Sequence, residues 1–394
     1  MIGKAEVSCR SLEIPRHNLV DEDIMPTLRV ISDVSQFMAL AGEWNALAAP
    51  FQTPLLRHEW FVACLKGFGE GRELAVFTAY ENGRLRAAAP FMIDRSALVP
   101  KLCALGYETT EPSGFIYADE AALAIVAKAV VACGLPAMVP RLRADGPELR
   151  TLRGSTTRLR GAWFVRFGNT ATATLPLGCN FAAFESRMPG AERRNIRRRL
   201  KLAERDGPVS FEVVTPDEDN VHRHLRELYE VESASWKRRT GTAILSDARI
   251  ERFCTEIGVK AAQMGILRLF FMRIGSTTAA AGMVLEYAGR LWGLKQSYNE
   301  RWAPCAPGIL LAQESIRYAC EKGLVAYEFL GLAEKFQTRW PIELTAYSRL
   351  RYYPWSLRSL VAVCDDALRL PLNRMRNRWQ SKSGSLSEFI HPAQ

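Results

Sequence analysis

The sequence predicts a mixed α/β protein made of two tandem copies of one unit, each a mixed twisted sheet flanked by helices. A length of 394 residues suits two domains of ordinary size. Both halves show the order helix, helix, three consecutive strands, helix and strand, which indicates an internal duplication. Hydrophobic residues make up 48% of the chain, and this is enough apolar material for two cores.

The first unit is predicted over residues 27–180, after a polar tail at residues 1–26. Asn82-Gly83 lies between two apolar runs, and an Asn-Gly pair in that setting is the strongest short signal for a β-hairpin. The other elements follow from the spacing of the apolar residues. They are a strand (28–31), helices (37–47 and 59–68), strands (73–80, 84–93 and 101–107), a helix (119–133), a strand (137–143) and a strand-containing connector (145–180).

The second unit is predicted over residues 181–354 and repeats the same order. Val221, Leu225 and Leu228 give its first helix one apolar face, and Gly323 ends its last helix. Its predicted elements are a strand (209–214), helices (215–229 and 247–263), strands (266–274, 279–288 and 290–299), a loop (300–308), a helix (309–322) and strands (326–332 and 344–353).

Charge and residue usage narrow the class of protein. The net charge of +10 favours anionic partners, among them phosphorylated cofactors, nucleic acid, acidic lipid and acidic polysaccharide. Nine cysteines without a C-x-x-C pair indicate reduced thiols in a cytoplasmic protein rather than a disulfide framework. The five histidines are scattered, so no metal site is expected. The absence of a helix-turn-helix or zinc pattern argues against a sequence-specific DNA-binding protein.

Neither a signal peptide nor a membrane span is predicted. The N-terminal tail carries charges throughout and lacks an apolar core. The most apolar segment, residues 121–139, contains Lys128 and is interrupted by Gly134 and Pro136, whereas about 20 unbroken apolar residues are needed to cross a bilayer. This segment is therefore predicted as a buried helix followed by a strand.

Residues 355–394 are predicted as a basic helical extension of the second unit. Its basic residues are interleaved with Leu, Met and Trp, a pattern that permits weak contact with a membrane surface. Asp365 and Asp366 weaken the basic face, so a helix packed back onto the domains is the favoured interpretation.

Four stretches of the second unit resemble the GNAT superfamily of acyltransferases. The similarity is closer to the CelD-like acetyltransferases named for cellulose biosynthesis, which are distant relatives of the FemAB peptidyltransferases. It covers residues 185–340 well and residues 30–145 by pattern only, and it depends on the order and spacing of the stretches. The stretches are Arg193-Arg194-Asn195-Ile196-Arg197-Arg198 with Leu200; Ser235-Trp236-Lys237; Ser297-Tyr298-Asn299 with Ala306-Pro307-Gly308; and Tyr327-Glu328-Phe329-Leu330-Gly331 with Glu334-Lys335-Phe336 and Trp340.

The resemblance implies two tandem GNAT-type domains, of which the second carries the working site. The first copy is expected to be degenerate. Pro112-Ser113-Gly114 occupies the place of the donor loop, but Phe115-Ile116-Tyr117 follows before the helix begins. This copy is interpreted as structural, or as one wall of the acceptor cleft.

The resemblance also implies acetyl-CoA or another acyl-CoA as donor, without a metal ion. In the family, the pantetheine arm pairs with the strand here at 290–299, and the pyrophosphate rests on the start of the next helix. A helix N-terminus suits a diphosphate because its N–H groups are unpaired and partly positive. The same residues also fit an ordinary Pro-Gly loop, and this loop has fewer glycines than the family's usual one. The expected donor-binding residues are Gln296, Ser297, Ala306, Pro307, Gly308, Ile309 and Leu310.

Two residues are the candidates for catalysis. Tyr298, beside the donor loop, is placed to protonate the departing thiolate, although an aromatic residue packed in the core fits equally well. Glu328 lies between apolar neighbours and is a candidate general base with a raised pKa. A salt bridge from Glu328 to Lys295 or Lys335 is the alternative. Cys305 has no suitably placed histidine and is interpreted as a bystander.

The acceptor site is expected to involve a basic helix. Six basic residues fall between Arg193 and Lys201, which suits an acidic acceptor, a phosphate or tRNA, although a solvated helix face is the usual interpretation of such a run. Trp236 is also compatible with a plain core position. The residues assigned to the acceptor are Arg194, Asn195, Arg198, Trp236 and Lys335.

The leading hypothesis is an acyl-CoA-dependent N- or O-acyltransferase. A role in exopolysaccharide, cellulose or cell-envelope biosynthesis, with the corresponding synthesis machinery as partner, is implied by the resemblance. The alternatives are a FemAB-like transferase that uses aminoacyl-tRNA, and a non-enzymatic subunit of a polysaccharide-synthesis complex. The sequence leaves open the acceptor, the acyl chain length and the oligomeric state.

Overall fold

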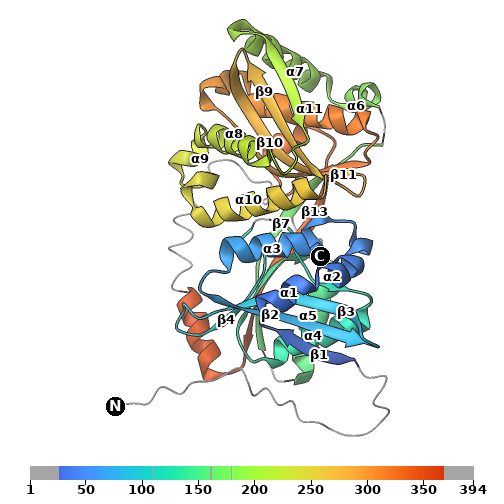
Figure 1. Cartoon of the computed structure of the whole chain (residues 1–394), viewed down its shortest axis with the longest axis vertical. Helices are drawn as coiled ribbons and strands as arrows, with labels where there is room; N and C mark the ends of the chain where they lie inside the picture. Colours follow the sequence, from blue (N-terminus) through green and yellow to red (C-terminus); the bar gives the residue numbers. More distant parts are fainter. Residues whose placement is uncertain (1–25, 110, 160–161, 179, 368–394) are drawn as a thin grey trace.

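The computed structural model describes residues 26–367, apart from residues 110, 160–161 and 179. Within this part of the chain, one sheet of 13 strands runs the length of the molecule with helices on both of its faces (Figure 1). The strands are β1 (Thr27–Ile31), β2 (Arg72–Glu81), β3 (Arg84–Asp94), β4 (Lys101–Ala104), β5 (Ile116–Tyr117), β6 (Ala137–Arg143), β7 (Ala162–Pro176), β8 (Val209–Val214), β9 (Leu267–Ile274), β10 (Thr277–Tyr287), β11 (Arg290–Tyr298), β12 (Ala326–Glu328) and β13 (Glu343–Pro354).

Helices cover both faces of the sheet. The α-helices are α1 (Val34–Ala39), α2 (Ala41–Ala48), α3 (His58–Phe68), α4 (Glu120–Ala132), α5 (Pro147–Leu159), α6 (Phe181–Arg187), α7 (Gly190–Ala203), α8 (Val221–Ser233), α9 (Trp236–Arg239), α10 (Ala248–Gln263) and α11 (Pro307–Glu321). Short 3₁₀ helices are η1 (Ala49–Phe51), η2 (Pro54–Leu56), η3 (Glu204–Asp206), η4 (Ile244–Ser246), η5 (Glu300–Cys305) and η6 (Lys335–Arg339). A further helix is described over residues 357–367.

The strand order shows the predicted duplication. It runs β1-β2-β3-β4-β6-β13-β7-β12-β11-β10-β9-β8, and β5 pairs with β3 outside this path. Among the named strands, two neighbouring pairs are parallel, β4 with β6 in the first half and β11 with β12 in the second. Each half therefore places one parallel pair in the same position among antiparallel strands, which confirms that one unit occurs twice.

Two strands, β7 and β13, pair with strands of the other half of the chain. β7 pairs with β12 of the second half, and β13, late in the chain, pairs with β6 of the first half. β7 and β13 also pair with each other, from Ala162 opposite Pro354 to Thr174 opposite Glu343. The two units consequently share one continuous sheet. β7 and β13 therefore join the two predicted units in space.

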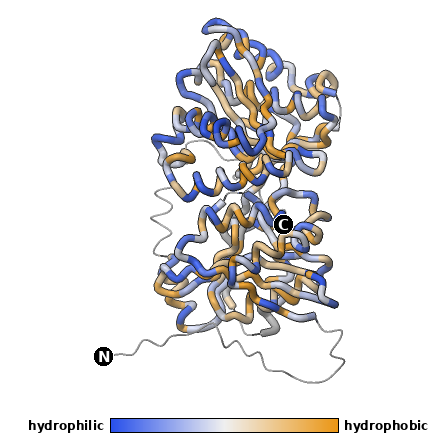
Figure 2. The backbone as a smooth tube through the Cα atoms, in the orientation of Figure 1, coloured by the Kyte–Doolittle hydropathy of each residue, from blue (hydrophilic) through white to orange (hydrophobic). Residues whose placement is uncertain are grey.

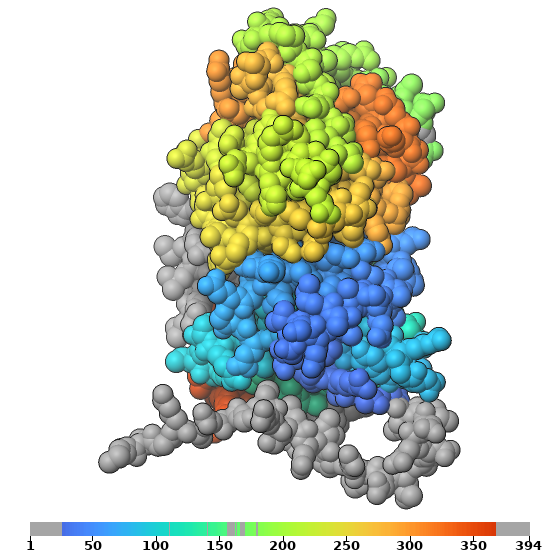
Figure 3. Space-filling view, viewed as in Figure 1, coloured from blue at the N-terminus to red at the C-terminus, as the bar shows by residue number. Residues whose placement is uncertain are grey.

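Helices α3 and α10 join the two units on one face of the sheet (Figures 1 and 3). Trp60 on α3 meets Phe253 on α10 edge to face, with ring centroids 5.2 Å apart. Gly67 permits this close crossing, because a Cβ atom there would lie 2.6 Å from Phe253 Cβ. One buried cluster contains side chains from α1, α2, α3, α8 and α10 and so spans both units. Figure 2 shows the matching pattern, with hydrophobic strands inside and hydrophilic residues toward the outer helices.

Two local predictions are confirmed by backbone geometry. Asn82 and Gly83 both have positive φ, 51° and 71°, as a tight two-residue hairpin between β2 and β3 requires. The apolar segment 121–139 forms α4 and the start of β6. No helix in the described part of the chain is long and apolar enough to cross a membrane.

The helix at residues 357–367 packs back onto the first unit, as favoured from sequence. Lys101 Nζ donates to Asp366 Oδ1 over 2.6 Å, and Tyr353 Oη donates to Asp366 Oδ2 over 2.6 Å. Ala362 is buried against Val99 and Tyr353. The polar tail at residues 1–25 and the end of the basic extension, residues 368–394, lie outside the described residues.

Candidate active site

The parallel strands β11 and β12 separate soon after they meet. They pair at three positions, the last being Trp292 opposite Glu328. β11 then continues along β10 to Tyr298, while positive φ angles at Leu330 (52°) and Gly331 (57°) turn the chain away after β12. The strand predicted over 326–332 therefore ends at Glu328. A cavity of about 580 Å³ lies in the resulting gap, within the size range of small-molecule sites.

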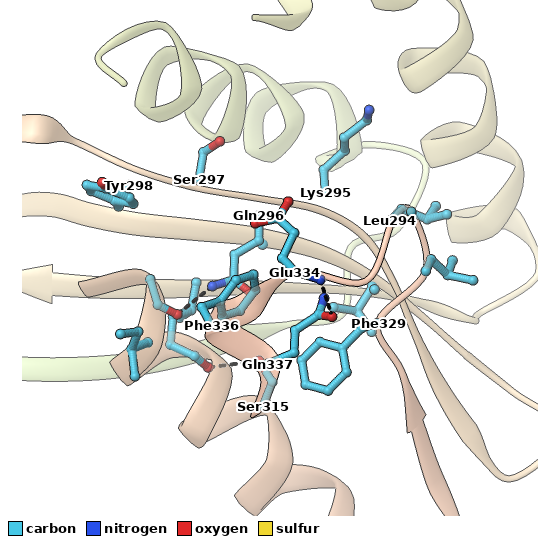
Figure 4. Close-up of a pocket in the computed structure, with 18 of the residues that line it drawn as sticks. Leu294, Lys295, Gln296, Ser297, Tyr298, Ser315, Phe329, Glu334, Phe336 and Gln337 are labelled. Atoms are coloured by element: carbon cyan, nitrogen blue, oxygen red, sulfur yellow. Dashed lines mark hydrogen bonds between the residues drawn. The ribbon is translucent and has the colours of Figure 1, made fainter. Parts of the chain in front are cut away.

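The cavity is lined by residues from both units. Figure 4 shows Lys295 and Ser297 on one side of β11, and Phe329, Phe336 and Gln337 on the other. The first unit contributes Glu111, so the second unit alone does not complete the wall. The principal lining residues are Gly293–Tyr298 of β11; Ala306, Gly308, Ile309, Leu311 and Ser315 at the start of α11; Phe329–Leu332, Glu334, Phe336 and Gln337 after β12; and Trp236 and Lys237 of α9.

A buried carboxylate fixes β11 against α8 and α9. Glu232 Oε1 accepts from Lys237 Nζ at 2.7 Å and from Ser297 Oγ at 3.3 Å, and Glu232 Oε2 accepts from the Ile244 amide at 2.7 Å. Lys237 Nζ also donates to the Gln296 carbonyl at 3.1 Å. These bonds place Trp236, the first residue of α9, at the cavity. Trp236 is half-buried there rather than sealed in the core.

The start of α11 borders the cavity. Ala306 caps the helix with a φ of 49°, and its carbonyl accepts from the amides of Ile309 and Leu310. Pro307 has no N–H to offer, and the Gly308 amide, in the first turn of the helix, has no partner among the described residues. Gln296 Nε2 donates to the Gly308 carbonyl, and a Cβ atom at residue 308 would lie 3.3 Å from Tyr298 Cδ1. The helix end therefore offers one free amide and the positive end of its dipole to the cavity.

Of the predicted donor-binding residues, Gln296, Ser297, Ala306, Gly308 and Ile309 line the cavity. Pro307 and Leu310 do not, because both are buried at the base of α11. Successive side chains of a helix point in different directions, so a continuous run of residues at the start of α11 includes some that face away from the cavity.

The structure separates the two predicted catalytic residues. Tyr298 lines the cavity at the end of β11. Glu328 points to the opposite side of β12 from Tyr327 and Phe329, both of which line the cavity. Its carboxylate accepts from Arg290 Nη1 at 2.5 Å and from Thr174 Oγ1 at 2.6 Å. The salt bridge of Glu328 is thus made with Arg290, not with the Lys295 or Lys335 considered from sequence.

Glu328 instead lines a second cavity of about 340 Å³ between the two units. Leu330 lines both cavities, so they adjoin at the bend that follows β12. The second cavity combines aromatic and charged side chains from both units: Phe51, Trp292, Tyr347, Arg143, Glu148, Arg290 and Glu328.

Two carboxylates at the first cavity were not selected from sequence. Glu334 follows the β12 bend, and its side chain is exposed toward the cavity. Desolvation by the surrounding protein disfavours the charged form of Glu334 and raises its pKa. The positive charge of Lys237 partly opposes this effect. Glu111 Oε2 accepts from the Gly331 amide at 2.7 Å and so ties the first unit to that bend. Glu334 belongs to one of the four stretches that resemble the GNAT superfamily, whereas nothing in the sequence indicated a role for Glu111.

The protein environment also shifts the pKa values of Lys295 and Cys305. Desolvation acts to lower the pKa of Lys295, but Cys254, Glu111 and Glu232 outweigh it and the pKa is raised, so this cavity residue stays cationic. Burial raises the pKa of Cys305, whose Sγ donates to the Trp302 carbonyl at 3.0 Å. The Cys305 thiol therefore stays protonated, which agrees with its interpretation as a bystander.

Residues 190–338 match the acetyltransferase (GNAT) domain family. We refer to this range, which lies in the second unit, as the GNAT domain after this match. This range contains β11, β12, the start of α11 and every residue named above that lines the first cavity, except Glu111. Comparison with curated protein sequences gives no match.

Solved structures support the tandem arrangement. FemX aligns with a TM-score of 0.54 at 12% identity, over 78% of this chain and 95% of FemX. The C-terminal domain of a predicted lysylphosphatidylglycerol synthetase from Agrobacterium fabrum aligns with a TM-score of 0.50 at 13% identity, over 84% and 97% of the two chains. A conserved protein of unknown function from Bacteroides thetaiotaomicron gives 0.52 at 7% identity, over 83% and 100%. These likenesses concern the fold alone. Each covers more than three quarters of this chain and so includes both units, which agrees with the predicted tandem arrangement.

The first copy closes the gap that the GNAT domain keeps open. After the parallel pairing of β4 and β6, Pro112 forms a bridge with Arg141, and the Ser113 amide donates to the Arg141 carbonyl at 3.2 Å. At the start of α4, Asp119 accepts from the Ala122 amide at 2.8 Å. A carboxylate at that helix end repels a diphosphate. In the first copy these contacts replace the gap seen between β11 and β12, and Glu111 of this copy lines the first cavity.

The residues predicted for the acceptor fall in three places around the GNAT domain. Trp236 lines the cavity, whereas Lys335 is exposed at the first residue of η6 and does not line it. Arg194, Asn195 and Arg198 lie on α7, which packs against η5 and α11 beside the cavity rather than within it. Arg198 donates to Asn195 Oδ1 at 3.3 Å, and the side chains of Arg194 and Arg198 are exposed. The structure therefore does not bring the basic helix and Trp236 together.

Proposed function

We propose that the GNAT domain is an acyl-CoA-dependent N- or O-acyltransferase whose donor lies between β11 and β12. The observation that carries the proposal is the parting of these strands after Trp292 around a cavity that ends at the start of α11. From Gly293 onward, the edge of β11 no longer has β12 as a partner, and such an edge offers main-chain groups to an extended ligand. The Gly308 amide and the dipole of α11 suit the diphosphate.

The acceptor is proposed to approach from the second cavity. Leu330 adjoins both cavities, so a molecule held between the units reaches the donor at the β12 bend. The second cavity offers aromatic faces and charged groups of both signs, a combination that suits a polar acceptor with an amine or hydroxyl group. A setting in cellulose, exopolysaccharide or cell-envelope biosynthesis in the cytoplasm follows from the CelD-like resemblance and the fold shared with FemX.

The reaction requires two proton transfers. The acceptor nitrogen or oxygen attacks the thioester carbonyl, a C–N or C–O bond forms, and the C–S bond breaks. Glu334, open to the cavity and with a raised pKa, is proposed to take the proton of the acceptor. Tyr298, beside Gly308 at the end of β11, is proposed to return a proton to the departing thiolate.

Replacing Gly308 by Glu tests the donor site. The new carboxylate would project from the start of α11 into the cavity and repel a diphosphate, so we expect acetyl-CoA binding to weaken by about 30-fold or more. Isothermal titration with acetyl-CoA and longer acyl-CoAs measures this. Gly308→Ala is the matched control, because it adds the same Cβ atom without charge. Equal affinities of the Glu and Ala variants would contradict the donor site.

Replacing Tyr298 by Phe tests protonation of the thiolate. The ring and its packing remain, so we expect KM for the acyl-CoA to change little while kcat falls by about tenfold. Steady-state assay of CoA release measures both constants. An unchanged kcat in Tyr298→Phe at all pH values would remove Tyr298 from the mechanism and leave it a cavity wall.

Aminoacyl-tRNA is the alternative donor, and the basic face of α7 is the observation that favours it. Exposed Arg194, Arg197 and Arg198 lie on a helix that packs against η5, next to the start of α11. Filter binding with charged tRNA, compared with acetyl-CoA titration on the same preparation, decides between the donors. Tight tRNA binding without acyl-CoA binding would support the alternative. Binding of neither would favour a non-enzymatic subunit of a synthesis complex.

A further inference from the structure

The helix at residues 357–367 is amphipathic, but it presents its apolar side to solvent. Ser359 and Ala362 are fully buried and Asp366 nearly so, whereas Leu357 is 84% exposed. Leu360, Val361 and Cys364 are also exposed, and with Leu357 they follow the spacing of one helix face. A surface helix ordinarily buries such a stripe against the protein, so the outward orientation of this one requires an explanation.

The cause is a buried polar anchor. Lys101 Nζ donates to Asp366 Oδ1, Tyr353 Oη donates to Asp366 Oδ2, and Arg351 lies 3.4 Å from the same carboxylate. The Ser356 side chain accepts from the Ser359 amide at the start of the helix. Separating the partners of a buried ion pair strongly destabilises a folded protein. The Lys101–Asp366 pair therefore fixes the rotation of the helix about its axis, and the leucine stripe faces outward.

The exposed stripe continues into neighbouring segments. Trp355, just before the helix, is 65% exposed, and Leu98 is 79% exposed beside Val99, which packs against the inner side of the helix. We call these six residues the apolar C-terminal face: Leu98, Trp355, Leu357, Leu360, Val361 and Cys364. The helix, red in Figure 1, lies beside β4 on the first unit, at the end of the molecule away from α7 and β9.

Positive charge accompanies the apolar C-terminal face. Arg358 is exposed on the same helix. The chain continues for 27 residues beyond the described helix, and this stretch carries five basic side chains against one acidic side chain in its sequence. They are Arg369, Arg374, Arg376, Arg378 and Lys382, against Glu388. Apolar side chains flanked by clustered cations are the pattern that binds the interface of an anionic bilayer.

We propose that the apolar C-terminal face docks the protein onto the surface of an anionic lipid bilayer. Leu357, Leu360 and Val361 enter the boundary between headgroups and acyl chains, while exposed Arg358 on the same helix contacts lipid phosphates and the basic sequence that follows adds to the attraction. A second copy of the chain is a poorer occupant, since pairing this face with itself brings two basic segments together on molecules that each carry a net charge of +10. The proposal does not depend on the acyltransferase activity.

Vesicle sedimentation of the full chain tests the docking. We expect about tenfold tighter binding to vesicles of phosphatidylcholine and phosphatidylglycerol than to phosphatidylcholine alone, and about a tenfold loss in Leu357→Glu/Leu360→Glu. Leu245→Glu/Val325→Glu is the matched control, because these side chains are about as exposed as Leu360 but lie on the second unit. Its binding should equal that of the unaltered protein. Equal vesicle binding by the two double variants would overturn the proposal, as would no binding by the unaltered protein.

A probe on the face itself provides the second measurement. An environment-sensitive dye on Cys364, in a Cys9→Ser/Cys133→Ser/Cys179→Ser background, should shift to the blue when anionic vesicles are added and stay unchanged with neutral ones. Blue emission before any lipid is added would show that the chain's own C-terminal segment covers the face. A concentration-dependent dimer in sedimentation velocity that Leu357→Glu/Leu360→Glu abolishes would show a second copy there. Either result would overturn the proposal.

Discussion

Replacing Glu334 by Gln is expected to lower kcat by about 100- to 1,000-fold, the size of effect typical for loss of a general base. Glu334 lies at the bend after β12 with its side chain open to the cavity, and the surrounding protein raises its pKa. A carboxylate with a raised pKa is the stronger base toward an acceptor amine or hydroxyl. The Gln side chain keeps the size of the residue and cannot take a proton.

The pH profile separates this role from a structural one. Glu334 is active as a base only when deprotonated, so kcat/KM of the unaltered enzyme should fall as pH drops through the raised pKa of Glu334. In Glu334→Gln that fall on the acid side should disappear. Glu343→Gln, an exposed residue at the start of β13, is the matched control and should keep both the rate and the profile. An acid-side fall that persists in Glu334→Gln would assign the proton transfer to another group.

Replacing Glu232 by Ala is expected to lower the free energy of unfolding by about 3–5 kcal/mol, the usual cost of removing one partner of a buried ion pair. Glu232 is buried on α8, and its two oxygens accept from Lys237, Ser297 and the Ile244 amide. Its loss leaves these donors without an acceptor and releases β11 from α8 and α9.

Urea unfolding followed by circular dichroism measures the change. Glu230→Ala is the matched control, because this exposed residue on the same helix loses the same charge without a buried partner. We expect its stability to stay within about 0.5 kcal/mol of the unaltered protein. A loss below about 1 kcal/mol in Glu232→Ala would show that the network around Glu232 does not hold β11 in place.

Features that depend on neighbours along the chain could be predicted from the sequence. Asn82-Gly83 set the first hairpin, because few other residue pairs adopt two positive φ angles in succession. The spacing of apolar residues predicted the order of helices and strands in both units. The break before Ile309 marked the start of α11, and with it the end of the cavity. These signals are local, so each one can be read without knowing the rest of the fold.

Which distant residues meet depends on the packing of the whole fold. The exchange that pairs β7 with β12 and β13 with β6 has no local signal, since strand partners are chosen by packing across the whole sheet. The alternation along β12 turns Glu328 away from the cavity that Tyr327 and Phe329 line. Glu111 reaches the site because the Gly331 amide binds its carboxylate across the two units.

The helix at residues 357–367 shows the same division. The sequence determined that it is amphipathic, and it predicted that the helix packs back onto the domains. Which side faces the protein was decided by Lys101, more than 250 residues earlier in the chain, whose buried charge requires Asp366 as its partner. The spacing of apolar residues predicts that a helix has an apolar and a polar face. The side chains against which the helix packs determine which of the two faces is buried.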